Sequence, residues 1–127
     1  MPLEKQLSVF VQNKVGSLGE LSTALAKANI NIKALSIVDD HDWGIVRLIV
    51  DDPEKTKKIF HKLGLTYGEG QVVTVMLENH TGALADLADK LEKKKINIEQ
   101  AFATASGDAS FVVLSTTDNK KANSVIG

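Results

Sequence analysis

The feature that most constrains this sequence is an internal repeat. Residues 13–18 recur as residues 79–84, and the same offset of 66 positions aligns the chain from Gln6 onward without a gap. Turn and core positions are where a shared fold constrains sequence, so the repeat predicts a duplicated module of about sixty residues. The strongest identities are Asn13, Gly16, Leu18, Leu21, Leu25, Ile30, Asn31 and Ile32, with their counterparts 66 positions later.

Each copy begins with a strand that leads through the repeated turn into a helix. Residues 6–12 and 73–77 alternate in polarity, which is typical of half-buried strands, and leucines at helical spacing follow both turns. Ser17 and Glu20 match a capping box at the first helix. We expect the two helices to stop at Asn29 and near Lys95.

The rest of the first copy supplies three more strands and a second helix. Residues 30–38 and 43–50 read as strands around a polar hairpin turn at 39–42, and Asp52-Pro53-Glu54 is a strong helix start. Gly64 should end that helix, and residues 65–70 can form a fourth strand. The order β-α-β-β-α-β predicts an α+β protein of two tandem ferredoxin-like modules, residues 1–70 and 71–127, with antiparallel sheets and helices on one face.

The second module is expected to lack its fourth strand, because Gly127 aligns with His61 in the repeat. Its first strand would then have an edge open to another segment or chain. The sheet faces turned away from the helices also carry a contiguous group of apolar side chains, so we expect edges and faces to pack on each other or on a second copy, as in a homodimer. These side chains are Phe10, Ile45, Ile49, Met76, Phe111 and Val113.

Composition excludes several classes of function. A formal net charge of −1 argues against binding to nucleic acid, and the absence of cysteine removes disulfides and thiolate chemistry. Residues 1–5 do not resemble a signal peptide, and no apolar stretch approaches membrane-spanning length, so no membrane partner and a cytoplasmic location are expected.

The repeated turn suits an anion. Asn favours tight turns, Gly permits a positive φ, and the following helix leaves its first N–H groups unpaired. The carboxylate of an amino acid could bind there, near residues 16–18 or 82–84, while an Asn side-chain oxygen accepts from its ammonium group.

Taken together, these motifs resemble the ACT domain. The resemblance rests on two motifs, N-x-x-G-x-L at the start of a helix and Ile-Asn-Ile at the start of the second strand. Both motifs occur twice at fixed spacing. The resemblance covers nearly the whole chain, which is similar to stand-alone proteins that consist of two ACT modules. It implies a sensor of small molecules, most often amino acids, that binds its ligand between paired ACT domains.

The resemblance also implies the site residues. In serine-sensing ACT domains the turn Asn and the second-strand Asn touch the amino acid, and these positions match Asn13 and Asn31, and Asn79 and Asn97 in the copy. Either Asn type could instead be structural, the first as a turn former and the second as the mark of a helix end. If only one turn binds, we favour the first, because Ser17 adds a hydroxyl group. The expected ligand-binding residues are Asn13, Val15, Gly16, Ser17, Leu18, Asn31, Asn79, Thr81, Gly82, Ala83, Leu84 and Asn97.

Enzymes with the same plan are a poor match. An acylphosphatase needs a catalytic Arg in an anion-binding loop, whereas the only Arg, Arg47, lies in a predicted strand. An RNA-binding sheet would need stacking aromatic residues. The histidines His41, His61 and His80 lack the spacing of metal ligands, although the hairpin cluster around His41 could bind a cation weakly.

We therefore predict no catalytic residues, no metal and no cofactor. The expected function is a regulatory protein that senses an amino acid and reports by a change in assembly. The alternative is an interaction subunit that dimerises or docks on a metabolic enzyme without sensing.

Overall fold

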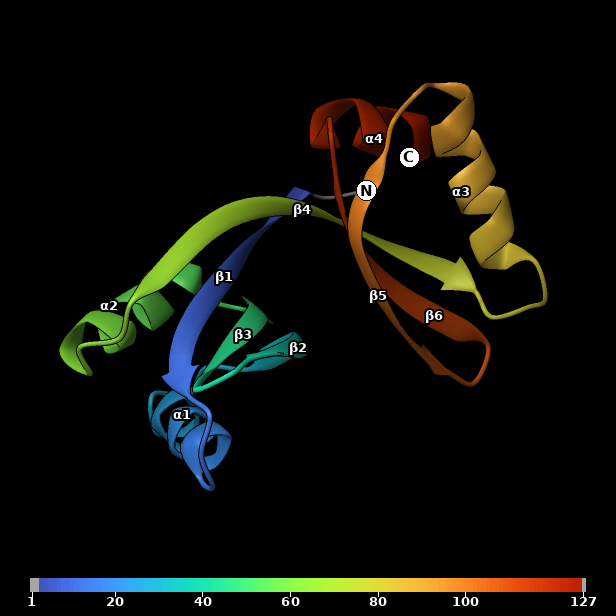
Figure 1. Ribbon diagram of the computed structural model, residues 1–127. Coiled ribbons are helices and arrows are strands. Elements are labelled where there is room, and N and C mark those ends of the chain that lie inside the picture. The colour runs from blue at the N-terminus through green and yellow to red at the C-terminus, as the bar shows by residue number, and fades with distance from the viewer. Residues whose placement is uncertain (1–2, 127) are drawn as a thin grey trace. The chain divides into compact units, whose positions relative to one another are not determined.

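The computed structural model describes residues 3–126, without the side chain of Asp40, and the chain divides into two compact units. The first is Lys5–Gly70, and the second comprises the residues from Gln71 onward together with Leu3 and Glu4. Within the described range the chain forms six antiparallel strands and four helices, an α+β architecture (Figure 1). Met1, Pro2 and Gly127, which entered the expectations about the chain ends, lie outside this range.

The first unit follows the predicted β-α-β-β-α-β order. Its strands lie in the order β2-β3-β1-β4, and alternate residues of the central strands, such as Val9 and its partner Val46, face the helices and are buried. Leu21, Leu25 and Phe60 of the helices complete this core. The elements are β1 (Leu3–Gln12), α1 (Ser17–Lys27), β2 (Ile32–Asp40), β3 (Trp43–Val50), α2 (Pro53–Lys62) and the start of β4 (Tyr67–Glu78).

The predicted start of α2 is confirmed. Asp52 is its N-cap, and the side chain accepts a hydrogen bond from the backbone N–H of Lys55 at 3.1 Å, while Pro53 occupies the first turn. The helix ends at Lys62, and Gly64 follows with φ +70°, a conformation that favours glycine.

The second unit repeats this layout. Its strands lie in the order β4-β6-β5, with Val75 of β4 opposite Val112 of β6, and α3 and α4 lie on one side of them (Figure 1). Leu87, Leu91 and Ala122 bring both helices into one core. Besides β4 the elements are α3 (Ala83–Lys93), β5 (Ile98–Ser106), β6 (Ala109–Thr116) and α4 (Asn119–Ile126).

Strand β4 differs from the prediction. A separate fourth strand at 65–70 and a new strand at 73–77 were expected, but one strand runs from Tyr67 to Glu78. In the second unit it lies between β6 and the beginning of β1. Leu3 packs against the second core, and Glu4 Oε2 accepts a hydrogen bond from the hydroxyl of Thr74 at 2.7 Å. The edge that was expected to be open to another segment or chain is therefore covered, at Leu3 and Glu4, by the beginning of β1, and the lack of a fourth strand in the second module stays a prediction.

The predicted apolar sheet faces are unequally exposed. Phe10 and Met76 remain 39% and 56% exposed, whereas Ile49 and Val113 are buried. The packing of these faces on a second copy stays a prediction. No helix among residues 3–126 has the length and apolar character needed to cross a bilayer.

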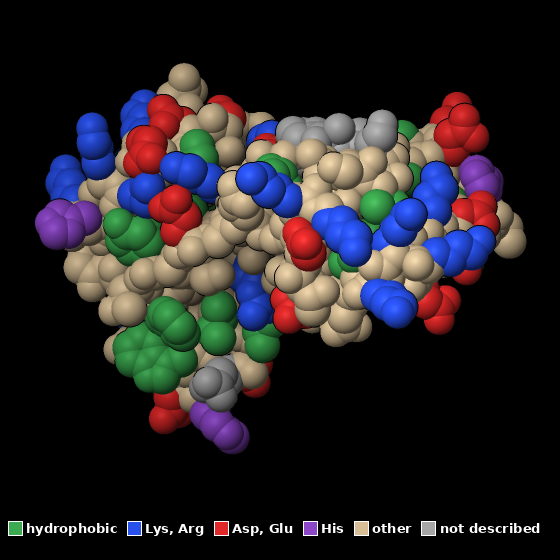
Figure 2. Space-filling view, turned by 90° about the horizontal axis from the view of Figure 1, so that it is seen from above, with side chains coloured by type: hydrophobic (Ala, Val, Ile, Leu, Met, Phe, Trp, Pro, Cys, Tyr) green, Lys and Arg blue, Asp and Glu red, His purple; other side chains and the backbone are tan. Residues whose placement is uncertain are grey.

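Four charged side chains link β1, α2 and β4 in the first unit. Lys5 Nζ lies 3.2 Å from Glu54 and 3.4 Å from Glu69, and Lys57 Nζ lies 2.9 Å and 2.7 Å from the same carboxylates. Hydrogen bonds from the lysines, that of Lys57 first, hold the pKa of both carboxyl groups below the usual value. The carboxylates in turn raise the pKa of both lysines. Basic and acidic side chains lie side by side over this unit on the left of Figure 2.

Candidate functional site

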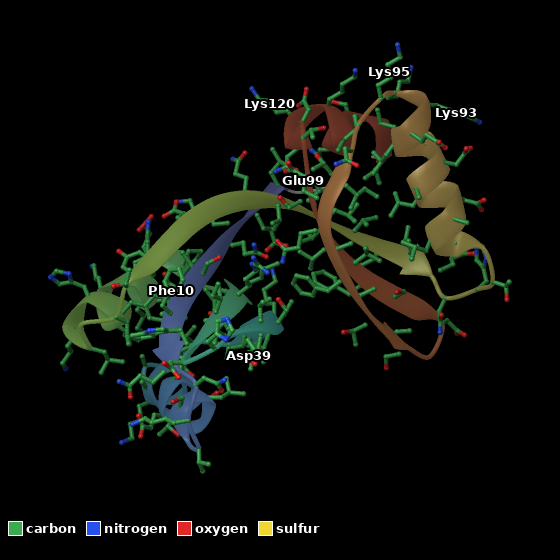
Figure 3. The ribbon with its side chains drawn as sticks, viewed as in Figure 1. Phe10, Asp39, Lys93, Lys95, Glu99 and Lys120 are labelled. Atoms are coloured by element: carbon green, nitrogen blue, oxygen red, sulfur yellow. The ribbon has the colours of Figure 1, made fainter. Side chains whose placement is uncertain are left out.

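Asn13 fastens the first turn to the β2–β3 hairpin. Its backbone N–H donates to the carbonyl oxygen of Asp42 at 2.8 Å, and its side-chain Nδ2 donates to Asp39 Oδ1 at 2.7 Å and to the carbonyl oxygen of His41 at 3.0 Å. Figure 3 labels Asp39 near the end of β1. The backbone and side-chain N–H groups of Asn13 thus hold the turn against the hairpin by hydrogen bonds.

The second turn is built in the same way. The backbone N–H of Asn79 donates to the carbonyl oxygen of Asp108 at 2.8 Å, and Nδ2 donates to that of Gly107 at 2.9 Å. In both copies of the repeat, the turn is therefore hydrogen-bonded to the hairpin of its own unit.

Both helices after the turns begin at a glycine. Gly16 and Gly82 are the N-caps, with φ +90° and +91°, and a Cβ atom at either position would meet nothing within 4 Å. The glycines are thus required by backbone conformation rather than by space. The predicted capping box is wrong, because Ser17 is already the first helical residue and no side chain caps the helix.

Unpaired backbone donors remain at the start of α1. The backbone N–H of Ser17 donates to the carbonyl oxygen of Lys14 at 3.3 Å and that of Glu20 to Gly16 at 2.9 Å. Among the described residues no hydrogen bond is recorded for the N–H groups of Leu18 and Gly19. Ser17 and Leu18 are half-buried, whereas Val15 is fully exposed. The start of α1 can therefore offer donors to an anion.

The start of α3 shows the same pattern with different side chains. The N–H groups of Leu84 and Ala85 have no recorded partner among the described residues. Ala83 is half-buried, and Thr81 and Leu84 are exposed. His80 Nδ1 lies 2.9 Å from the carbonyl oxygen of Thr81.

The second-strand asparagines lie far from the turn asparagines. Asn31 is fixed at the end of β3, where its backbone N–H donates to Asp51 Oδ1 and its carbonyl oxygen accepts from Asp51, both at 3.1 Å. Asn13 lies beside the start of β3, so the two are separated by the length of that strand, roughly 24 Å. Asn97, bonded in the same way to Thr117, is as remote from Asn79. Asn13 and Asn31 of one unit cannot touch the same small ligand.

A cavity of about 740 Å³ lies next to the first turn. Its walls come from the end of β1, the first turns of α1, the start of β3 and the connection from α2 to β4. The backbone N–H of Phe10 donates to the carbonyl oxygen of Thr66 at 2.9 Å, and both residues line the cavity. Figure 3 labels Phe10 at its place on β1. The lining is Phe10, Val11, Gln12, Lys14, Ser17, Glu20, Leu21, Ala24, Trp43, Leu63, Gly64, Leu65 and Thr66.

Of the lining residues, only Ser17 belongs to the ligand-binding residues predicted from the sequence. Lys14 lies within the repeated turn, and Glu20 was interpreted as part of a capping box. The sequence shows both charges, but neither residue was assigned to the ligand-binding site. The segment from Leu63 to Thr66 was missed because nothing local in it points to a ligand. The cavity therefore adds a wall that the turn motif does not contain.

The described part of the fold does not bring potential metal ligands together. No group of three or more His, Asp or Glu side chains suited to a metal ion occurs among the described residues. His41 takes a left-handed turn conformation with φ +59°, and His61 is exposed on α2. Trp43, at the start of β3, is 49% exposed and lines the cavity.

Comparisons with known proteins agree with this architecture. The family model of an ACT domain pair matches residues 2–127. A crystal structure of a protein from Bacteroides thetaiotaomicron is 35% identical and superposes with a TM-score of 0.93, over 98% of this chain and 86% of that one.

More distant structures share the fold alone. The regulatory subunit of aspartate kinase from Thermus thermophilus, in its ligand-free form, is 13% identical with a TM-score of 0.73, over 98% of this chain and 93% of that one. A structure of aspartokinase alpha and beta subunits is 18% identical with a TM-score of 0.64, over 99% and 95%. No curated protein sequence matches the chain.

Proposed function

Because the chain belongs to the family of paired ACT domains, we propose that it is a regulatory protein, without catalytic activity, that binds a free amino acid or similar small molecule at its repeated turn. The observation that carries this proposal is the first turn, where the unpaired N–H groups of Leu18 and Gly19 lie between Ser17 and Glu20, two residues that line a cavity. A carboxylate suits such donors at the positive end of a helix. Regulatory subunits of aspartate kinase use the same fold.

We further propose that response to the ligand involves assembly. Since Asn13 and Asn31 of one unit lie at opposite ends of β3, a ligand that touches both types of Asn requires a second ACT module. A homodimer formed through sheet edges or apolar faces would supply one. The two modules, residues 1–70 and 71–127, would then each present one turn.

A thermal-unfolding screen with each of the twenty amino acids tests the proposal. A ligand that binds only the folded protein, at about 100 times its dissociation constant, stabilises it by about 2.7 kcal/mol. Gly16→Ala and Gly82→Ala form a matched pair, because each strains a backbone with positive φ by roughly 1–2 kcal/mol without a steric contact. Both should lower stability similarly, and only the variant at the binding turn should also weaken the ligand.

One observation favours the second candidate, an interaction subunit that docks on a metabolic enzyme without sensing. The side-chain N–H groups of Asn13 and Asn79 already donate hydrogen bonds to the hairpins of their own units. Under this alternative no amino acid at millimolar concentration shifts the unfolding temperature.

A further inference from the structure

The cavity beside the first turn lies between helix ends of opposite polarity. Its lining includes Ser17 at the N-terminus of α1 and Leu63 and Gly64 at the C-terminal end of α2. Unpaired N–H groups make a helix N-terminus partly positive, and unpaired carbonyl groups make a C-terminus partly negative. The cavity is therefore polarised from one wall to the other.

Two side chains in the lining carry opposite charges. Lys14 and Glu20 are exposed, and no ion pair or hydrogen bond of either side chain is recorded among the described residues. A simple anion would use Lys14 and leave Glu20 unmatched, and a simple cation would do the reverse. A zwitterion matches both.

The remaining walls are mostly apolar. Leu21 and Ala24 of α1 face the cavity together with Leu65, and Phe10, Trp43 and Leu63 at its margin are 39%, 49% and 50% exposed. Hydrophobic side chains gather at the surface over this unit on the left of Figure 2. A volume of about 740 Å³ is in the range of small-molecule sites, which combine apolar walls with a few polar groups.

We propose that this cavity binds one α-amino acid with a large apolar side chain, with Lys14 facing its carboxylate and Glu20 its ammonium group. The inference rests on the proposed function and assigns that function a ligand class and a place. Leu21, Ala24 and Leu65 enclose the ligand side chain, and the positive end of α1, where Ser17 lines the cavity, assists Lys14.

The second unit carries different side chains at positions that line the cavity in the first, so we expect one ligand per chain. Lys90 stands at the position of Ala24, Ala83 at that of Ser17 and Ala109 at that of Trp43.

Isothermal titration of the full chain with leucine and phenylalanine tests the proposal. Each is compared with its amine, which lacks the carboxylate, and its acid, which lacks the ammonium group; for leucine these are 3-methylbutylamine and 4-methylpentanoate. We expect one site per chain and an affinity at least about tenfold above that of either analogue.

The charge variants give the sharper readout. In Lys14→Gln the preference for the amino acid over its amine should collapse, and in Glu20→Gln the preference over its acid should collapse. Ala24→Lys, which introduces the residue of the second unit, should abolish binding. His80→Gln and Asp86→Asn change the corresponding positions of the second unit and should leave affinity unchanged. Circular dichroism checks that every variant is folded.

The outcomes separate this inference from the proposed function. If leucine or phenylalanine binds equally well to Lys14→Gln and Glu20→Gln, the site lies elsewhere and only the inference fails. Tighter binding of serine or aspartate than of leucine and phenylalanine would refute the apolar ligand class. If none of the twenty amino acids binds, both the proposed function and the inference fail.

Discussion

Replacing Leu25 with alanine is expected to destabilise the first unit by about 3 kcal/mol. Leu25 is fully buried among Leu7, Leu48 and Phe60. The change removes three carbon atoms, worth about 2.4 kcal/mol at about 0.8 kcal/mol each, and the cavity left behind adds to this cost. A unit of this size has a total stability of only roughly 3–10 kcal/mol, so the variant would lie close to its unfolding threshold.

The single tryptophan makes this loss measurable in one unit. Trp43 lies at the start of β3, so its fluorescence during urea unfolding reports on the first unit. With an m value of about 1 kcal/mol per molar urea, the midpoint should fall by about 3 M. Leu91→Ala is the matched control, because Leu91 is equally buried in the second core. It should move the circular dichroism transition more than the Trp43 transition.

A small effect would refute the reasoning. If Leu25→Ala lowers the Trp43 midpoint by less than about 1 M, the free energy lost is below the cost of deleting a packed leucine. The core of the first unit would then be less tightly packed than its burial indicates.

Three further predictions concern single contacts. Asp52→Ala and Asp118→Ala each remove a carboxylate that accepts a hydrogen bond from a backbone N–H at a helix start, and each should cost about 1 kcal/mol in chemical denaturation. The ion pairs hold the pKa of Glu54 below its usual value. Their stabilisation is therefore present above the pKa of the unfolded state and is lost as the pH falls through the pKa of the folded state. The unfolding temperature of Glu54→Gln should fall less steeply with acid than that of the unaltered protein, and an equal slope would contradict this. Asn13→Asp replaces a side chain that donates to a carboxylate of the hairpin with a second carboxylate, so two negative charges would face each other. It should destabilise the protein more than Asn79→Asp, because the acceptor of Asn79 is a neutral carbonyl oxygen. Thermal unfolding of the two variants measures the difference.

Most of the fold could be predicted because its signals are local. Residues 6–12 largely alternate in polarity, and Asp52 followed by Pro53 marks a helix start by side-chain and backbone chemistry alone. The membership of the family was likewise visible in residues a few positions apart. These features depend little on distant parts of the chain.

The errors occurred where local signals compete or are absent. Ser17 resembles an N-cap, but Gly16 reaches the required positive φ more easily and takes that position. The repeat predicted two separate strands, at 65–70 and 73–77, in what is one strand. The contact of Leu3 and Glu4 with the second unit spans 70 positions and leaves no pattern in either segment.

The candidate site was predicted only in part for the same reason. The turn motif is local and was found twice, and Ser17 of the predicted set lines the cavity. The opposite placement of Asn13 and Asn31 follows from strand direction, which the motif does not show. The wall from Leu63 to Thr66 reaches α1 only through the folded chain.

The place of Leu3 and Glu4 in the second unit has a consequence for the order of folding. During synthesis these residues emerge before any of the segment they join, while the first unit can close once residue 70 is available. The hydrogen bond between Glu4 and Thr74 is a long-range contact, and such contacts form slowly because a long loop must close first. On the ribosome, the beginning of β1 must wait for the second half of the chain, so the two units are expected to mature at different times.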